Sequence, residues 1–241
     1  MSVGDNRIAG DMLTASASAV FGDKNAGSGK TVTVQNASLS GTDAGNYAIV
    51  NTGGTANADI AQRGLDLSFA AVNKVYDGTI DAALIIGDNR IAGDVLTASA
   101  SAAFGDKNAG SGKTVTVRNA SLSGTDAGNY AIVNNGGVTT ADIAQRGLTL
   151  SFTGVNKVYD GATGAAVTIG DDRIAGDMLA ASASAAFGDK NAGSGKTVTV
   201  QDASLSGTDA GNYAIVNTGG STTASIAQRV LTLSFAGVNK V

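Results

Sequence analysis

Hydrophobic and polar residues alternate with a period of two along much of the chain. In the segment 13–21, LTASASAVF, the residues at 13, 15, 17, 19 and 21 are apolar, and Thr or Ser occupies most of the positions between them. Successive side chains of a strand point to opposite faces, so this pattern predicts a half-buried β-strand. Alanine favours helices, and a short helix here is the alternative. The interleaved Ser and Thr argue against it.

The same alternation predicts further strands, and turn-forming residues separate them. Clusters of Gly, Asn, Asp and Ser, which tolerate positive φ and close turns, lie between the alternating segments. The chain is therefore expected to be all-β. The additional strands are expected in LDLSF (65–69), TVTV (31–34), YAIV (47–50) and around Ile60 in ADIAQ (58–62).

The chain is one unit of 83 residues written almost three times. IAGD begins at Ile8, Ile91 and Ile174, and both GTDAGNYAIV and IAQR recur with the same spacing. A period this long indicates small domains in tandem, each with its own core, rather than a solenoid of short repeats.

These spacings predict the domain boundaries. Residues 64–146 and 147–229 are complete repeats, 1–63 is a partial repeat that lacks its opening strand, and 230–241 is the opening strand of a next repeat. Ends that ignore the repeat phase suggest an excised fragment. A cut before each Tyr-Asp-Gly is the alternative phase, with pieces 1–75, 76–158 and 159–241.

The repeats follow one another without a linker. Only Gly64 or Gly147 separates IAQR of one copy from the opening strand of the next. Such a junction limits hinge motion compared with a Gly/Ser tether, so we expect a semi-rigid, monomeric rod. The strand at Leu231–Phe235 either remains without a partner or covers an edge of a neighbouring molecule.

DAGNY is the most specific fold signal in the repeat. A Tyr that begins a strand just after a turn matches a tyrosine corner, in which the Tyr hydroxyl bonds back across the turn. The expected corner residues are Asp43, Gly45, Tyr47, Asp126, Gly128, Tyr130, Asp209, Gly211 and Tyr213.

This corner resembles that of immunoglobulin-type sandwiches. Those domains place a Cys where Ile49, Ile132 and Ile215 stand here, and the chain has no Cys and no Trp. An antibody-type domain is thereby excluded, and a small Ig-like β-sandwich is the expected architecture of each repeat. The alternative is a β-grasp-like α+β unit, with the Ala/Ser segment as its helix.

Composition restricts the chemistry. The 241 residues are 43% hydrophobic, which is ordinary for a folded protein, but they include no His, Cys, Pro or Glu. The commonest proton shuttles, thiol nucleophiles and zinc ligands are therefore missing. We expect the chain not to be an enzyme.

Charge and hydropathy argue against two classes of partner. The formal net charge is −4 and no basic run occurs, whereas nucleic-acid binders concentrate Lys and Arg on one face. No apolar stretch approaches the ~18 residues that a membrane span needs. The first ten residues also lack the layout of a signal peptide. We expect neither nucleic-acid binding nor membrane insertion.

AGSGKT, at 26–31 and in both later copies, resembles the end of a phosphate-binding loop. That motif requires a Gly where Lys24, Lys107 and Lys190 stand, and it requires a helix where TVTV predicts a strand. Nucleotide binding is therefore not expected. The segment is interpreted as a Gly-rich connection between strands with an exposed Lys30.

No cofactor is expected, and calcium is the one alternative. Asp and Asn offer the oxygen ligands that calcium prefers, although no EF-hand spacing occurs. The competing interpretation is that these residues cap and close turns. The clusters are Asp5, Asn6 and Asp11; Asp23 and Asn25; Asp43 and Asn46; and Asp171, Asp172 and Asp177.

The Tyr-Asp-Gly sequences are candidate surface motifs. An exposed Tyr beside an Asp suits the face and hydroxyls of a sugar. The competing interpretation is a half-buried Tyr at a turn that Asp-Gly closes. The residues are Tyr76, Asp77, Gly78, Tyr159, Asp160 and Gly161.

Three ordered motifs give the unit a family resemblance. VNKVYDGTIDAAL (72–84), FGDKNAGSGKTVTV (104–117) and LSGTDAGNYAIV (122–133) resemble the YDG-type repeats of large bacterial surface adhesins, including filamentous-haemagglutinin-like exoproteins. The resemblance implies an exported Gram-negative surface protein in which the repeats form a stalk or contribute to adhesion. It offers no catalytic residues. The alternative is that each repeat weakly binds glycans or proteins of a host or neighbouring cell and acts through avidity.

Overall fold

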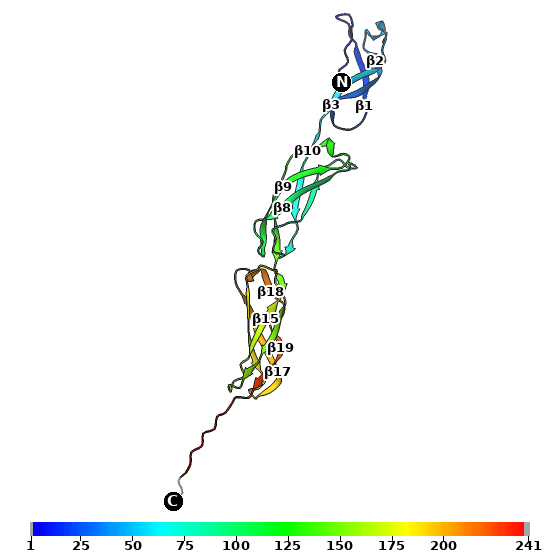
Figure 1. The fold of residues 1–241 in the computed structure, drawn as a ribbon. Coiled ribbons are helices and arrows are strands. Elements are labelled where there is room, and N and C mark those ends of the chain that lie inside the picture. The colour runs from blue at the N-terminus through cyan, green and yellow to red at the C-terminus, as the bar shows by residue number, and fades with distance from the viewer. Residues whose placement is uncertain (1, 239–241) are drawn as a thin grey trace. The chain divides into compact units, whose positions relative to one another are not determined.

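The described residues, 2–238, fold into β-strands with only three one-turn 3₁₀ helices (Figure 1). The structure is a computed structural model. The Ala/Ser segment is strand β1 (Thr14–Phe21) and its counterparts are β8 (Thr97–Phe104) and β16 (Ala180–Phe187). The all-β prediction is confirmed, and the β-grasp alternative is wrong because its proposed helix is a strand. Within residues 2–238 there is no helix with the length and hydrophobicity to cross a bilayer.

The remaining elements recur with the sequence repeat. The first repeat continues with β2 (Gly27–Ser40), η1 (Ala44–Asn46) and β3 (Gly54–Ile60). The second contains β4 (Arg63–Leu65), β5 (Leu67–Ala71), β6 (Lys74–Val75), β7 (Leu84–Asp88), β9 (Gly110–Ser123), η2 (Ala127–Asn129), β10 (Tyr130–Ile132) and β11 (Gly137–Ala144). The third contains β12 (Arg146–Leu148), β13 (Leu150–Val155), β14 (Lys157–Val158), β15 (Ala166–Asp171), β17 (Gly193–Ser206), η3 (Ala210–Asn212), β18 (Tyr213–Ile215) and β19 (Gly220–Ala227).

The third repeat shows the topology in full. Its main sheet has the order β14-β19-β17-β16, and the second repeat has the matching order β6-β11-β9-β8. Two smaller pairs complete the third repeat: β13 runs antiparallel to β15, and β12 runs parallel to β18. The central apolar residues of β17, Val198 and Val200, are buried with Phe187 of β16, as the alternating pattern predicts.

A β-bulge interrupts the longest hairpin of the third repeat. Ser182 pairs with Ser204 and Ser184 with Gln201, so two residues of β17 oppose one of β16. Asp202, in the bulge, has φ 55°, and its counterparts Asn36 and Asn119 have φ 56°. Asp and Asn enter this left-handed region more readily than other non-glycine residues. Both residues therefore suit this position, where two copies have Asn and one has Asp.

The chain forms two compact units whose boundary lies inside the second repeat. One unit holds residues up to Ala70 together with Leu84–Ser101 and Val117–Gly137, and the other holds Ala71–Ala83, Ala102–Thr116 and the residues from Val138 on. The first unit therefore contains the first repeat and part of the second, and the other contains the rest of the second repeat and the third.

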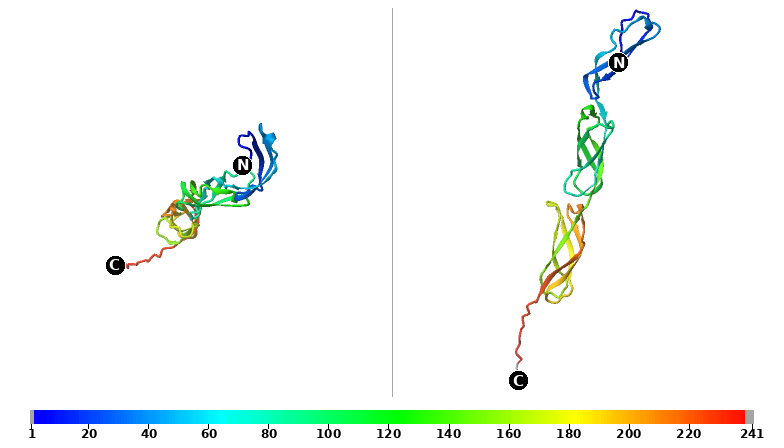
Figure 2. Two further views of the ribbon diagram at one scale, coloured as in Figure 1. Left: turned by 90° about the horizontal axis from the view of Figure 1, so that it is seen from above. Right: turned by 90° about the vertical axis from the view of Figure 1, so that its right-hand side faces the viewer.

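The two incomplete ends lack strands that the complete repeats have. YAIV of the first repeat forms no strand, because its counterparts β10 and β18 pair with β4 and β12, and residues 2–62 contain no equivalent of these. Residues 228–238 also form no strand (Figure 2). Residues 239–241 of the predicted opening strand lie outside the described residues.

Candidate functional site at the junction between repeats

The IAGD turn and the DAGNY corner, which are far apart in sequence, form one hydrogen-bonded unit in every repeat. In the third repeat the backbone N–H of Ile174 donates to the Tyr213 hydroxyl (2.9 Å), which itself donates to Oδ2 of Asp177 (2.6 Å). Tyr47 and Tyr130 make the same two contacts in their copies. The corner tyrosine thus bonds to a turn that lies 39 residues upstream in the chain.

The corner aspartate holds the segment after that turn. Oδ2 of Asp209 accepts a hydrogen bond from the backbone N–H of Met178 (2.8 Å), and the N–H of Asp209 donates to the Met178 carbonyl (3.1 Å). Asp43 and Asp126 do the same in their repeats. Gly45, Gly128 and Gly211 lie in the 3₁₀ turns between these aspartates and the tyrosines.

Asp177 also receives two side chains from the preceding repeat. The Tyr76 hydroxyl lies 2.9 Å from Oδ2 of Asp177, and Nζ of Lys107 lies 2.9 Å from its Oδ1. Lys107 reaches Asp209 as well, at 3.4 Å. The carboxylate of Asp177 therefore binds three side chains, one from its own repeat and two from the preceding one.

The tyrosine of the YDG motif is buried at this junction. Tyr76 is 1% exposed and packs edge-to-face on Tyr213, with ring centroids 5.5 Å apart. Nζ of Lys107 lies over the Tyr76 ring at 5.7 Å, a cation–π contact. Tyr76, Tyr213 and the buried Leu148 belong to a single apolar cluster that crosses the repeat boundary.

A second set of hydrogen bonds connects the two repeats at the same boundary. Oδ1 of Asn212 accepts from the backbone N–H of Ala109 (2.8 Å), and the Gln145 side-chain amide donates to the Gly211 carbonyl (2.9 Å). Asn212 is 3% exposed. Within residues 2–238 every buried side-chain nitrogen and oxygen has a hydrogen-bond partner. A desolvated boundary is thereby formed without the penalty of unmet polar groups.

At the junction between the first and second repeats, the equivalent residues make the same contacts, except that no tyrosine equivalent to Tyr76 takes part. Nζ of Lys24 lies 2.7 Å from Asp94 and 2.9 Å from Asp126. Asn129 accepts from the N–H of Ala26, and Gln62 donates to the Gly128 carbonyl. The side chain of Asp94 is 11% exposed, whereas that of Asp177 is 3% exposed, because Tyr76 covers only the latter.

These contacts shift the ionisation of the junction groups. Burial alone would raise the pKa of Asp177, but hydrogen bonds from Tyr213, Lys107 and Tyr76 outweigh it and hold that pKa below its ordinary value. Burial, together with the bond to Asp177, raises the pKa of Tyr213 to about 12. Contacts with Tyr76 and Asp177 raise the pKa of Lys107. At neutral pH the junction thus pairs an ionised carboxylate with a cation and two neutral phenols.

The rest of the YDG motif closes a turn. Oδ1 of Asp77 accepts from Nζ of Lys74 (2.8 Å) and from the backbone N–H of Thr79 (2.9 Å). Although burial acts in the opposite direction, these bonds lower the pKa of Asp77 to about 2. Gly78 supplies φ 79° for the turn.

The second YDG motif repeats this turn, with Asp160 bound to Lys157 and Ala162 and with Gly161 at φ 83°. Tyr159 is half-buried against the core of the third repeat. Tyr76 is buried rather than exposed, so the sugar-facing surface that the sequence suggested does not exist at this copy.

The Gly-rich motif is part of a strand. It opens β2, β9 and β17, where the N–H of Gly112, for example, donates to Asp142 (2.7 Å). The interpretation of Lys30 as exposed is wrong: its side chain is 16% exposed and pairs with Asp23. The lysine that precedes Asn-Ala, Lys24 or Lys107, was not predicted to have a role. Its ammonium group pairs with an aspartate of the next repeat.

The aspartates considered as calcium ligands have other partners. Asp5 and Asp171 bind the guanidinium groups of Arg7 and Arg173, and Asp23 pairs with Lys30. In the part of the chain that the structure describes, no three acidic side chains converge as a metal site would require.

A family model described as the YDG domain matches residues 2–56, 62–140 and 144–225. No curated protein and no solved structure matches the chain.

Proposed function

The chain belongs to the YDG domain family, and on this premise we propose that its repeats are the stalk or spacer of a large bacterial cell-surface adhesin. The proposal gives the repeats a mechanical task and no catalytic one. It places them outside the cell, as part of an exported protein of the filamentous-haemagglutinin-like type. Binding to glycans or proteins of another cell would then be the task of other parts of that protein.

The observation that carries the proposal is that residues of the repeat's motifs bind the next repeat. Tyr76 of YDG and Lys107 of the Gly-rich motif both contact the carboxylate of Asp177 in that repeat. A ligand-binding motif keeps its side chains available to solvent, whereas a stalk uses its motifs to join one domain to the next. The burial of Tyr76 favours the stalk.

The junction contacts support a semi-rigid connection between repeats. Strand β12 begins directly after Gln145, and Gln145 itself donates to the next 3₁₀ turn. A bend at this point would expose an apolar cluster and separate a buried carboxylate from its donors, which is costly. We propose a rod of such repeats, each roughly 3–4 nm long if strands of ~10 residues run along it.

For each complete repeat we propose an Ig-like sandwich. Its support is that Phe152 of β13 and Val167 of β15 pack against the buried face of the sheet that contains Val198. A second pair of strands thus covers the main sheet, as a two-layer sandwich requires.

Two measurements test the stalk. Small-angle scattering of the full chain is expected to give an elongated monomer at low concentration; a compact particle would contradict the proposal. Arrays of glycans and matrix proteins are expected to show no binding by chains of one, two or three repeats. Binding that strengthens with repeat number would instead favour the alternative, in which each repeat is a weak binding module acting through avidity.

A further inference from the structure

The turn between β10 and β11 has a sequence of its own in the second repeat. It reads NNGG at 134–137, whereas the other copies have Thr52 and Thr218 where Asn135 stands. Asn135 is exposed and lies in a bend between the two strands, outside the sheet. It is also the one asparagine of the chain that a glycine follows.

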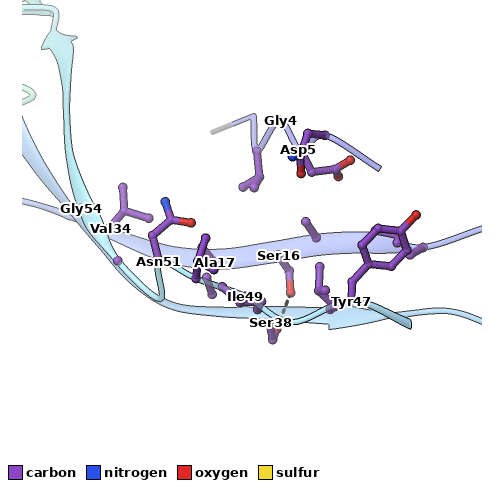
Figure 3. Close-up of a pocket in the computed structure, with 18 of the residues that line it drawn as sticks. Gly4, Asp5, Ser16, Ala17, Val34, Ser38, Tyr47, Ile49, Asn51 and Gly54 are labelled. Carbon is purple, nitrogen blue, oxygen red and sulfur yellow. Dashed lines mark hydrogen bonds between the residues drawn. The ribbon is translucent and has the colours of Figure 1, made fainter. Parts of the chain in front are cut away.

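The fold requires glycine at the position after Asn135. A Cβ on Gly136 would overlap the carbonyl oxygen of Val117, because the backbone of the turn lies directly against the neighbouring strand. Figure 3 shows the corresponding turn of the first repeat, where Gly54 lies beside Val34, its partner in the sheet. The backbone nitrogen that follows Asn135 therefore has no side chain beside it to block its approach to another group.

The hydrogen bond that closes this turn is longest in the second repeat. The N–H of Ala120 donates to the Asn135 carbonyl at 3.4 Å, whereas the equivalent bonds to the carbonyls of Thr52 and Thr218 are 3.1 and 2.9 Å long. A donor–acceptor distance of 3.4 Å exceeds the normal range for an amide hydrogen bond. The backbone of Asn135 is therefore restrained less than that of its two counterparts.

We propose that Asn135 is a modification site, at which the folded chain deamidates spontaneously to isoaspartate and aspartate. The backbone nitrogen of Gly136 loses its proton to hydroxide and attacks Cγ of Asn135. A new N–C bond closes a succinimide ring while the bond from Cγ to the amide nitrogen breaks, and that nitrogen takes a proton from water and leaves as ammonia. Water then opens the ring at either carbonyl. Asparagine is among the thermolabile residues, and the reaction needs no enzyme.

Isoaspartate lengthens the main chain at a point where both neighbours are held. Its side-chain carbon enters the backbone, so one more atom separates Asn134 from Gly136. The Asn134 side chain accepts from the N–H of Leu67 (2.8 Å) and donates to its carbonyl (2.6 Å), while Gly136 lies against Val117. The added atom displaces one of these contacts, and the hydrogen bonds of Asn134 give way more easily than a close approach of two backbones. Strand β5, which begins at Leu67, is therefore loosened. The inference does not rest on the stalk function.

Incubation of the full chain at mildly alkaline pH, followed by tryptic digestion and mass spectrometry, tests the site. Residues 119–146 form one tryptic peptide that contains both Asn135 and Asn119, and Asn119 precedes alanine. The amide of Asn135 is expected to convert to an acid at least about tenfold faster than that of Asn119, which corresponds to a barrier lower by about 1.4 kcal/mol. Asn135→Thr, the residue of the other copies, is the matched control and abolishes the reaction. Equal rates at Asn135 and Asn119, or an unchanged Asn135, would overturn the proposal.

A parallel incubation in urea separates the folded turn from the bare sequence. Asn-Gly reacts in an unfolded chain as well, so the proposal requires the folded chain to deamidate Asn135 at a rate within about tenfold of the rate in urea. The exposed bend and the long hydrogen bond to Ala120 are the reasons to expect this. If Asn135 reacts in urea but keeps its amide in the folded chain, the fold protects the site and the proposal fails.

Amide hydrogen exchange tests the structural consequence, since it reports local opening of the fold. The aged chain with isoaspartate at position 135 is expected to exchange faster than the fresh chain in β5. Strand β13 of the third repeat is the internal control and keeps its rate. Freshly prepared Asn135→Asp adds the charge without lengthening the backbone, so its β5 should exchange as in the fresh chain. Equal exchange of β5 in the fresh and aged chains would overturn the loosening of this strand.

Discussion

The phenolic hydroxyl of Tyr76 donates to the carboxylate of Asp177, 101 residues later in the chain and in the next repeat. The same carboxylate accepts from Tyr213 and pairs with Lys107. Asp177 therefore organises the turn of its own repeat and fixes the preceding repeat to it.

Replacing the lysine at the junction should destabilise the chain. Lys107→Ala leaves the buried carboxylate of Asp177 without its cation, so we expect the free energy of unfolding to fall by about 1–3 kcal/mol. Lys190→Ala is the matched control, because Lys190 occupies the same position in the third repeat and is exposed. It should change stability by less than about 0.5 kcal/mol. Urea unfolding followed by circular dichroism measures both; equal losses would contradict the junction role of Lys107.

The hydroxyl of the YDG tyrosine Tyr76, as well as its ring, should contribute to the stability of the fold. Tyr76→Phe keeps the packing on Tyr213 but removes the donor to Asp177, so we expect a loss of about 0.5–1.5 kcal/mol. Tyr159→Phe alters the same motif where the tyrosine only packs against its own repeat, and it should be close to neutral. Limited proteolysis should also cut Tyr76→Phe faster near residue 146. If the two variants behave alike, the hydroxyl does not act across the junction.

The local features of the fold were predictable from the sequence, and the junction was not. Alternation in TASASAAF and TVTV identified strands because one face of each is buried, and DAGNY drew attention to the tyrosine of the corner. Asp177 and Lys107, in contrast, look like ordinary turn and loop residues, since their partners lie in another repeat. Pairing over 70 to 101 residues depends on how domains pack, which periodicity does not encode. The 83-residue recurrence of Lys-Asn-Ala was the available signal, and its resemblance to a phosphate loop obscured it.

The glycine before the corner should be irreplaceable. Gly207 has φ 112°, and a Cβ there would lie 2.7 Å from the Met178 carbonyl oxygen, so Gly207→Ala combines backbone strain with an overlap. We expect a loss of about 3 kcal/mol or more. Gly211→Ala is the control, since a Cβ at Gly211 meets nothing within 4 Å. Comparable melting temperatures for the two variants would show that the close contact between the Gly207 and Met178 backbones is not needed for stability.

The β-bulge should select residues by backbone conformation. At Asp202, with φ 55°, substitution by Asn reproduces the other copies and should change stability by less than about 0.5 kcal/mol. Asp202→Val should cost about 1–2 kcal/mol, because a β-branched residue tolerates the left-handed region poorly. Asp202→Gly separates the causes: glycine accepts this φ but loses the contact with Ser184. A stability for Asp202→Gly as low as that for Asp202→Val would attribute the cost to the lost side chain instead.

Alkaline pH should loosen the junction between the second and third repeats. The pKa of Tyr213 is raised from 10.0 to about 12, because burial and the bond to Asp177 favour the neutral phenol. A group with a raised folded-state pKa contributes stability that is complete below its unfolded pKa and is lost as the pH rises toward the folded value. The free energy of unfolding should therefore fall between pH 10 and pH 12, with Tyr213 contributing at most about 2–3 kcal/mol.

The control for this pH dependence is Tyr213→Phe. Lys107 and Tyr76, whose pKa values are also raised, remain in both chains, so they contribute to both pH profiles. Tyr213→Phe should be less stable at neutral pH, since Asp177 loses a donor, but its stability should decline less steeply above pH 10. Urea midpoints at closely spaced pH values, read beside the ultraviolet absorbance of tyrosinate, give the two slopes. Equal slopes would mean that Tyr213 ionises as readily in the folded chain as in the unfolded one, and that the contact with Asp177 does not hold its proton.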